Sequence, residues 1–319
     1  MFQQTIKNFN INFNALNERN TVSSGDVLTG HISFELTKET KITAITLALK
    51  GGANVHWSTG GGGGRKRRHR KNYSAKVEFF HFKILLLQAS AAVGGTPKLQ
   101  PGTHVYPFTC HLPQGEFPSS FHGPHGQIAY TLTVGIDRPW HMVKDFATEL
   151  NYVYRINTNQ PELGAPLSGS NTMTLCCLWC ASGPITLKAS IEKKAFVPGE
   201  TVKIICELSN ASSRTATPKV TLQQKQVYYT LNKANKTVVM KNLASVTGQP
   251  ISAYTSDVHT EIMFTIPPSA SPTISNCSIL DIDNVLEVSL SVRAYPTLDV
   301  LFPIILCDTP VNADPPPYM

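Results

Sequence analysis

Hydrophobic and polar residues alternate along much of the chain, and long stretches with a helical period of 3.6 residues are missing. The segments 26–36, 41–49 and 131–136 show the alternation, with apolar positions at Leu28, Ile32, Phe34, Leu36, Ile45, Leu47, Leu49, Leu132, Val134 and Ile136. Successive side chains of a β-strand point to opposite faces, so this pattern predicts strands with one buried face. We therefore expect an all-β protein with turns rich in Gly and Pro.

The pattern occurs twice. The segment SSGDVLTGHISFEL, Ser23 to Leu36, aligns with VPGETVKIICELSN, Val197 to Asn210, so that Gly25-Asp26 corresponds to Gly199-Glu200. The apolar positions Val202, Cys206 and Leu208 then match those of the first copy. A second pair of segments, 106–136 and 262–292, shares an apolar-Pro turn, a Pro-Ser/Thr loop and an alternating strand. Two copies of one plan, each of roughly 150 residues, predict two similar β-sandwiches in tandem.

The boundary between the copies is predicted from composition. The segment RINTNQPELGAPLSGSNT, Arg155 to Thr172, is rich in Pro, Gly, Ser and Asn, which is typical of a linker. We expect an N-terminal sandwich at 1–155, a linker at 156–172, a C-terminal sandwich at 173–308 and a short disordered C-terminal tail at 309–319.

Overall composition indicates a folded, intracellular protein. Of the 319 residues, 41% are hydrophobic and 15% charged, which excludes an extended disordered chain for most of the length. The N-terminus lacks the apolar region of a signal peptide, and the apolar stretches fall short of the roughly 18 residues of a membrane span. The seven cysteines are therefore expected as reduced thiols.

A basic segment accounts for much of the charge of +7. It follows five glycines in GGGGGRKRRHRKN, Gly60 to Asn72, and consists of Arg65, Lys66, Arg67, Arg68, Arg70 and Lys71. One interpretation is a solvated loop between strands, and a second is contact with an anionic membrane or an acidic partner. A third is a nuclear-import or nucleic-acid patch. No aromatic residues are interleaved as in single-strand binding platforms, so nucleic acid is not expected as a partner.

The segment CCLWC contains Cys176, Cys177 and Cys180 around Trp179. A Cys-x-x-Cys pair is half of a zinc site, but the sequence has no second pair at suitable spacing, so we expect no metal. Buried thiols at the first strand of the second domain are the main interpretation. Reversible palmitoylation of these cysteines is a further hypothesis.

The chain ends in NADPPPYM, which contains the motif Pro-Pro-x-Tyr at Pro315, Pro316 and Tyr318. Composition alone would give this motif roughly 0.05 times per chain. The stretch is Pro-rich and aperiodic, so we expect an exposed polyproline II conformation that fits the aromatic groove of a WW domain. The alternative is a disordered end without a partner.

The sequence offers little for catalysis. His122 and His125 lie in a Gly-Pro turn and are expected to be solvated, without a carboxylate partner at a fixed offset. We find no nucleophile elbow, no HExxH motif and no phosphate-binding loop. We therefore expect no enzyme activity, no catalytic residues and no cofactor.

Taken together, these segments resemble the arrestin superfamily, and more closely its arrestin-domain-containing branch, the alpha-arrestins. The resemblance extends over nearly the whole chain, and the carrying segments are VSSGDVLTGHI (22–32), LQPGTHVYPFTCHLPQGEFPSSF (99–121), DRPW (137–140), CCLWCASGPITL (176–187), FVPGE (196–200) and the terminal Pro-Pro-x-Tyr. The resemblance implies two arrestin-type immunoglobulin-like β-sandwiches. The chain departs from the family pattern, a long tail with two or more Pro-Pro-x-Tyr motifs, because it has a single such motif at its last residues. Avidity from a second site is therefore not expected.

The resemblance also implies a function. Alpha-arrestins are cytosolic adaptors that connect cytoplasmic parts of membrane receptors or transporters with WW domains of HECT-type E3 ubiquitin ligases. We expect this chain to be cytoplasmic, associated with the plasma membrane and endosomes, and to promote ubiquitination, endocytosis and endosomal sorting. Two alternatives stay open: an arrestin-fold trafficking scaffold that acts without ligase, and a nuclear or nucleic-acid-associated protein that acts through the basic segment.

Overall fold

The computed structural model describes residues 5–60, 70–88, 98–177, 180–293 and 295–311, with the backbone alone for 175–177 and 180–182. Within these ranges, no helix is both long and apolar enough to cross a membrane. The chain divides into two compact units. Unit 1 is Met1–Tyr154 with Tyr229–Asn235 and Asn276–Ile279, and unit 2 is Arg155–Tyr228 with Lys236–Ser275 and Leu280–Met319.

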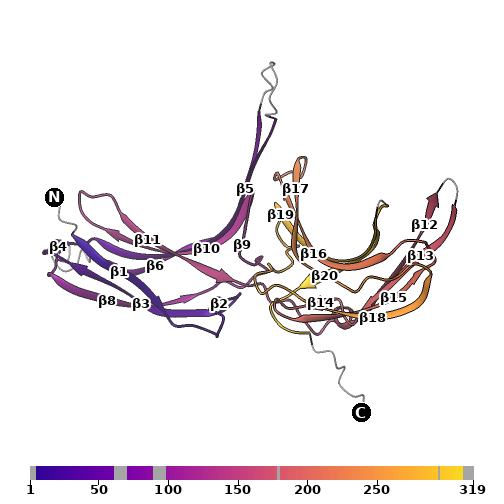
Figure 1. The fold of residues 1–319 in the computed structure, drawn as a ribbon. Helices are drawn as coiled ribbons and strands as arrows, with labels where there is room; N and C mark the ends of the chain where they lie inside the picture. Colours follow the sequence, from indigo (N-terminus) through magenta and orange to yellow (C-terminus); the bar gives the residue numbers. More distant parts are fainter. Residues whose placement is uncertain (1–4, 61–69, 89–97, 178–179, 294, 312–319) are drawn as a thin grey trace, which may run out of the picture. The chain divides into compact units, whose positions relative to one another are not determined.

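Unit 1 is a β-sandwich (Figure 1). Its strands are β1 (Ile6–Phe13), β2 (Thr21–Val22), β3 (Val27–Leu36), β4 (Thr40–Lys41), β5 (Ala44–Thr59), β6 (Lys71–Gln88), β7 (Lys98–Leu99), β8 (Gly102–His111), β9 (Phe121–Gly123), β10 (Gly126–Asp137) and β11 (Lys144–Tyr152). The smaller sheet has the order β1-β3-β8, and the larger sheet has the order β2-β11-β10-β5-β6 with β9 beside β10. Strands β4 and β7 pair separately.

Unit 2 repeats this plan. It contains helix α1 (Pro161–Gly164) and strands β12 (Leu167–Cys177), β13 (Cys180–Ile191), β14 (Ala195–Phe196), β15 (Thr201–Asn210), β16 (Ala216–Tyr229), β17 (Lys236–Thr247), β18 (Thr255–Thr265), β19 (Leu280–Val292) and β20 (Leu298–Leu306). One sheet has the order β12-β13-β15-β18 and the other β14-β20-β19-β16-β17. The predicted all-β fold of two tandem sandwiches is confirmed.

The apolar positions that alternate in the sequence form the two cores. All those from Leu28 to Ile136 named in the alternating segments are buried, and so are Val202, Cys206 and Leu208 in unit 2. Alternation places these side chains on the inner face of each sheet, where they pack against the facing sheet. Burial of this apolar surface is the main contribution to the stability of each unit.

The turn before β3 and the turn before β15 have the same geometry. Gly25 and Gly199 both have a positive φ, 75° and 90°, which L side chains rarely adopt. The carboxylate that follows each glycine accepts a hydrogen bond from the backbone N–H three residues earlier: Asp26 from Ser23 at 2.8 Å and Glu200 from Val197 at 2.9 Å. The alignment of Gly25-Asp26 with Gly199-Glu200 therefore corresponds to a repeated structural device.

The segment 156–172, which was expected to be a linker, is partly regular structure. Helix α1 covers Pro161–Gly164, and β12 begins at Leu167, where it pairs with Ile191 of β13. The Ser, Gly and Asn content indicated a loop, but pairing with a neighbouring strand outweighs such weak propensities. The change from one compact unit to the other falls between Tyr154 and Arg155.

Candidate functional site

The larger sheet of unit 1 has one face on the core and one face outward. We call the second face the outer face. Cross-strand register places on it the residues that alternate with the core positions: Thr46, Ala48, Lys50, Gly52 and Asn54 of β5, Gln127, Ala129, Thr131 and Thr133 of β10, and Asp145, Ala147, Glu149 and Asn151 of β11. Small and polar side chains dominate this set, so the strand backbone lies close to the surface.

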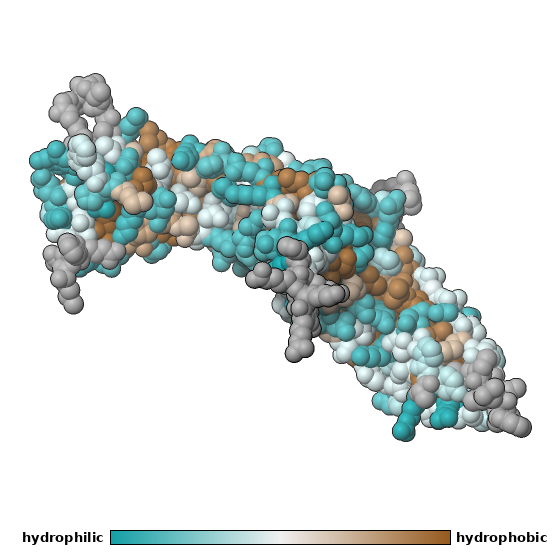
Figure 2. Space-filling model, turned by 90° about the horizontal axis from the view of Figure 1, so that it is seen from above, coloured by the Kyte–Doolittle hydropathy of each residue, from teal (hydrophilic) through white to brown (hydrophobic). Residues whose placement is uncertain are grey.

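Figure 2 shows the molecule from above. Within unit 1, this is the side on which β6, β10 and β11 lie in Figure 1. Brown hydrophobic residues form narrow strips there between white and teal ones. A shallow hollow on the outer face is lined by residues that include Lys50, Glu78, Gln127 and Thr131. Lys50 and Glu78 form an exposed ion pair at 3.2 Å. A broad, polar and shallow surface suits binding of a protein segment better than catalysis on a small molecule.

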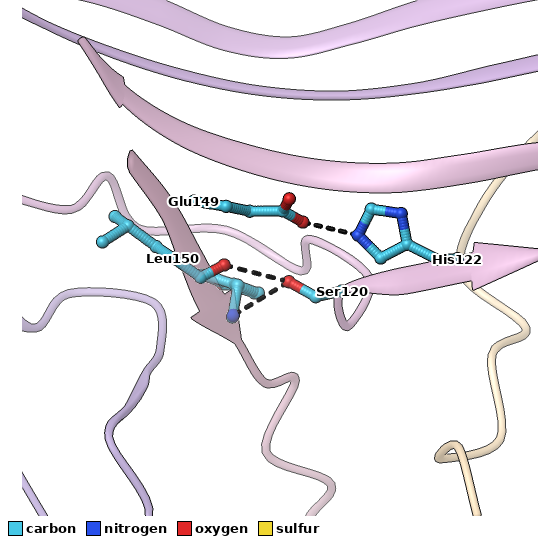
Figure 3. Close-up of polar contacts among 5 residues, drawn as sticks. Ser120, His122, Glu149 and Leu150 are labelled. Carbon is cyan, nitrogen blue, oxygen red and sulfur yellow. Dashed lines mark hydrogen bonds and ion pairs between the residues drawn. The ribbon is translucent and has the colours of Figure 1, made fainter. Parts of the chain in front are cut away.

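The Pro-Ser loop, residues 118–120, is held at one end of the outer face by hydrogen bonds to β11 (Figure 3). Ser120 accepts a hydrogen bond from the backbone N–H of Tyr152 at 2.9 Å and donates to the carbonyl of Leu150 at 3.3 Å. His122 Nε2 lies 2.6 Å from Glu149 Oε1, and both side chains are about half exposed. His122 is exposed as expected, but it also has a carboxylate partner that no sequence offset indicated, because β9 and β11 pair one after the other along the same edge of β10.

Aromatic rings support the outer face from below. Tyr130 of β10 stacks on Tyr152 with ring centroids 4.3 Å apart, and Phe80 of β6 lies 5.8 Å from the Tyr130 ring. The Tyr130 hydroxyl donates to the carbonyl of Pro118 at 2.6 Å, and burial raises its pKa above the usual range. These contacts fix β6, β10 and the Pro-Ser loop relative to one another.

The basic segment connects β5 to β6. Thr59 ends β5 and Lys71 begins β6, and Arg70 and Lys71 are exposed. Figure 1 shows the two strands extending beyond the rest of unit 1 before this connection. Trp57 stacks on Tyr73 with ring centroids 5.2 Å apart, which stabilises the end of the hairpin next to this connection. Arg65, Lys66, Arg67 and Arg68 lie outside the described residues.

The cysteine segment forms the hairpin between β12 and β13. The backbone of Cys177 pairs with that of Cys180, and Cys176 pairs with Ala181. Among the residues that the structure describes, no group of three or more His, Cys, Asp or Glu side chains could hold a metal ion. The side chains of Cys176, Cys177 and Cys180 lie outside the description, so their burial and palmitoylation stay predictions.

The chain is anchored shortly before its C-terminal motif. Val311 is buried in a small cluster with Leu163, Ala195, Val197 and Cys307. The motif residues Pro315, Pro316 and Tyr318 follow this cluster and lie outside the described residues. Sequence reasoning also missed Glu149 as a surface site residue, because only strand pairing brings it to His122.

Two β-sandwiches with matching sheet order and matching Gly-acid turns define an arrestin-type interaction protein. Family models agree: "Arrestin (or S-antigen), N-terminal domain" matches residues 9–159, and "Arrestin (or S-antigen), C-terminal domain" matches residues 181–311. Mouse arrestin domain-containing protein 4 is 30% identical over 291 residues, 91% of this chain and 69% of that protein. Its human counterpart is 29% identical over 292 residues, with the same coverage.

Human thioredoxin-interacting protein is 25% identical over 309 residues, 96% of this chain and 75% of that protein. The chain therefore belongs to the arrestin family, in its alpha-arrestin branch. The resemblance expected from the sequence motifs is confirmed.

Proposed function

We propose that the chain is a non-enzymatic adaptor that links cytoplasmic parts of membrane receptors or transporters to HECT-type E3 ubiquitin ligases. Pro315, Pro316 and Tyr318 bind the WW domain of the ligase, and the sandwich units bind the cargo. The observation that carries this proposal is the Pro-Pro-x-Tyr motif on a chain of the arrestin family. Ubiquitination of the cargo then promotes its endocytosis and endosomal sorting, and the adaptor acts in the cytoplasm, at the plasma membrane and on endosomes.

The anchored position of Val311 supports this role. Pro315 follows Val311 by four residues, so it can lie no more than about 14 Å away even if the chain is fully extended. A WW domain on the motif is thereby kept near the surface of unit 2, around Leu163 and Val197. A short tether of this kind raises the effective concentration of a bound ligase near cargo on the same adaptor.

Calorimetry with purified WW domains of HECT-type ligases tests the motif. The native chain should bind with micromolar affinity, and Tyr318→Ala should lose this binding because the tyrosine fills its own pocket in the groove. Pro317→Ala is the matched control, since it changes the variable position of the motif and should leave binding nearly unchanged. No binding by either the native chain or Tyr318→Ala would contradict ligase recruitment and favour a scaffold that acts without ligase, and equal binding by both would exclude the motif as the binding site.

The outer face of unit 1 is our candidate cargo surface. Ala129 and Thr131 lie at its centre, where small side chains allow a partner to approach the strands closely. Thr131→Arg should abolish cargo ubiquitination in cells while WW binding stays intact. Thr201→Arg, at an exposed position of β15 in unit 2, is the control and should retain cargo ubiquitination. Loss of function in the control alone would place the cargo on unit 2.

Microscopy tests the proposed location and the role of the basic segment. The native chain should be cytoplasmic with signal at the plasma membrane and endosomes, and neutralising Arg65 to Lys71 should weaken the membrane signal through lost attraction to anionic lipids. Nuclear accumulation that depends on these residues would instead support the nuclear alternative.

A further inference from the structure

The loop between β10 and β11 exposes apolar side chains at one end of unit 1. Trp140 and Met142 are almost fully accessible to solvent, and Val143 is about half exposed. Trp140 has a φ of +63°, which is uncommon for a residue with a bulky side chain. The loop is held in this form by a hydrogen bond from the His141 N–H to the Arg138 carbonyl at 3.2 Å. The geometry thus presents an aromatic ring to solvent, at a position where neither core packing nor strand pairing requires one.

A cationic hollow lies beside this loop. Lys38, Lys41 and Arg138 line it, together with Thr5, Thr40 and His141. Glu39 also lines the hollow, but it pairs with Lys98 at 3.2 Å, and the hydrogen bond from Gln100 and the Lys98 ammonium hold the pKa of Glu39 below its usual range. The hollow therefore carries an excess of positive charge, although Asp137 and Asp145 flank the loop in sequence.

One polar atom of a residue that lines the hollow is unsatisfied. Arg138 Nε is buried and has no hydrogen-bond partner among the described residues. A buried guanidinium N–H without a partner costs free energy, and an anionic oxygen is the acceptor that would satisfy it best. Arg138 thus points to an anionic group as the ligand of the hollow.

We propose that the Arg138–Val143 loop and its hollow dock on the surface of an anionic phospholipid bilayer. Trp140 and Met142 enter the boundary between headgroups and acyl chains, where an indole ring is favoured because it is both apolar and a hydrogen-bond donor. Arg138, Lys38 and Lys41 bind lipid phosphates. The combination of exposed apolar side chains with adjacent cations is what distinguishes a bilayer from an acidic protein segment as the occupant. The proposal is independent of ligase recruitment.

Vesicle co-sedimentation of the full chain tests the proposal. The vesicles are phosphatidylcholine alone and phosphatidylcholine with phosphatidylserine at about 4:1. The native chain should bind the anionic vesicles. Trp140→Asn with Met142→Ser should weaken binding at least about tenfold, since two apolar side chains no longer enter the bilayer. Asn tolerates a positive φ, so this variant should fold normally. Arg138→Gln should weaken binding about fivefold.

Tyr254→Asn with Met240→Ser is the matched control. Tyr254 has a φ of +55°, and both side chains are well exposed in unit 2, so this variant removes similar apolar surface at another place. It should bind anionic vesicles as the native chain does. Because the basic segment could also attract lipids, each variant is compared in a background with Arg65 to Lys71 neutralised.

The fluorescence of Trp140 gives an independent readout. Its emission should shift to shorter wavelength on anionic vesicles, and the shift should disappear in Trp140→Asn. Three results would overturn the proposal: no vesicle binding by the native chain, equal binding by the Trp140 variant and the control, or saturation of the hollow by soluble glycerophosphoserine that leaves vesicle binding unchanged. Binding to an acidic peptide without vesicle binding would assign the surface to a protein partner and would also overturn it.

Discussion

Lys193 and Glu200 form an ion pair within unit 2, with Nζ and Oε1 2.5 Å apart and side chains only 8% and 22% exposed. The other carboxylate oxygen of Glu200 accepts the backbone N–H of Val197 at 2.9 Å. Lys193 also lies over the ring of Phe196, 5.2 Å from its centroid. The Gly-acid turn before β15 thus neutralises a buried lysine in addition to holding the backbone.

Glu200→Gln should destabilise the protein by about 3 kcal/mol. The amide oxygen can still accept the Val197 N–H, but the charge of Lys193 is left buried and unpaired. Glu207→Gln is the control, because the Lys188–Glu207 pair is 3.4 Å apart, with side chains 61% and 50% exposed, and such pairs contribute about 0–1 kcal/mol. Urea unfolding of both variants measures the difference. Equal losses would show that Lys193 is solvated or has another partner.

Glu287→Gln should stabilise the protein at neutral pH. Burial raises the pKa of Glu287 above its usual range, the nearby Asp299 raises it further, and Lys219 opposes both. A carboxyl group whose pKa is raised in the folded state binds its proton more tightly when folded, so stability is lost as pH rises through that pKa. Gln lacks this ionisation, and its amide can keep the hydrogen bond from Gln223.

The measurement is the melting temperature of native chain and variant as a function of pH. The gain from Glu287→Gln should be largest at neutral pH and should vanish toward about pH 3, where the glutamate is protonated in both states. Glu261→Gln serves as control, because Glu261 is exposed and pairs with Lys203 at 2.7 Å. A gain that does not change with pH would rule out ionisation of Glu287 as its cause.

Cys110, Cys206 and Cys307 should resist alkylation in the native protein. All three thiols are buried, and burial raises the pKa of each to about 11. The thiolate is the reacting form, so at pH 8 only about one thiol in a thousand would be reactive even if it were accessible. Iodoacetamide treatment followed by mass spectrometry should find these three cysteines modified only after unfolding. Rapid native modification of any of them would contradict the buried arrangement.

Sequence alone predicted the features that depend on local pattern. Period-two alternation places Leu28, Ile32 and Phe34 on one face, and the structure buries all three. The Gly-acid repeat was visible because the positive φ of Gly25 and Gly199 requires that residue type in both copies. These signals lie within a few residues of one another, so no knowledge of strand pairing was needed.

The remaining features depend on contacts between distant residues. Glu149 meets His122, 27 residues away in the chain, only because β9 and β11 pair one after the other along the same edge of β10. Lys38 and Arg138 line one hollow because the backbone N–H of Thr43 donates a hydrogen bond to the carbonyl of Asp137 at 2.9 Å. This bond holds the two chain segments side by side. The first part of β12 was predicted to be a linker, because composition alone did not reveal that β13 is its partner strand. Each of these contacts joins segments that are far apart in the chain, so no pattern within one segment could supply them.

Gly51→Ala should destabilise unit 1 by about 1–3 kcal/mol, although alanine is the smallest possible change. A Cβ at Gly51 would lie 2.7 Å from the ring of Tyr130 and 2.9 Å from that of Phe80, so both rings would have to move. The Tyr130 hydroxyl bonds the carbonyl of Pro118, and its displacement would also loosen the Pro-Ser loop beside the outer face. Gly164→Ala, whose Cβ would approach no atom closer than 3.9 Å, is the matched control. Thermal unfolding should show a loss for Gly51→Ala alone; a loss of equal size in both variants would mean that backbone freedom, rather than contact with Tyr130, decides the effect.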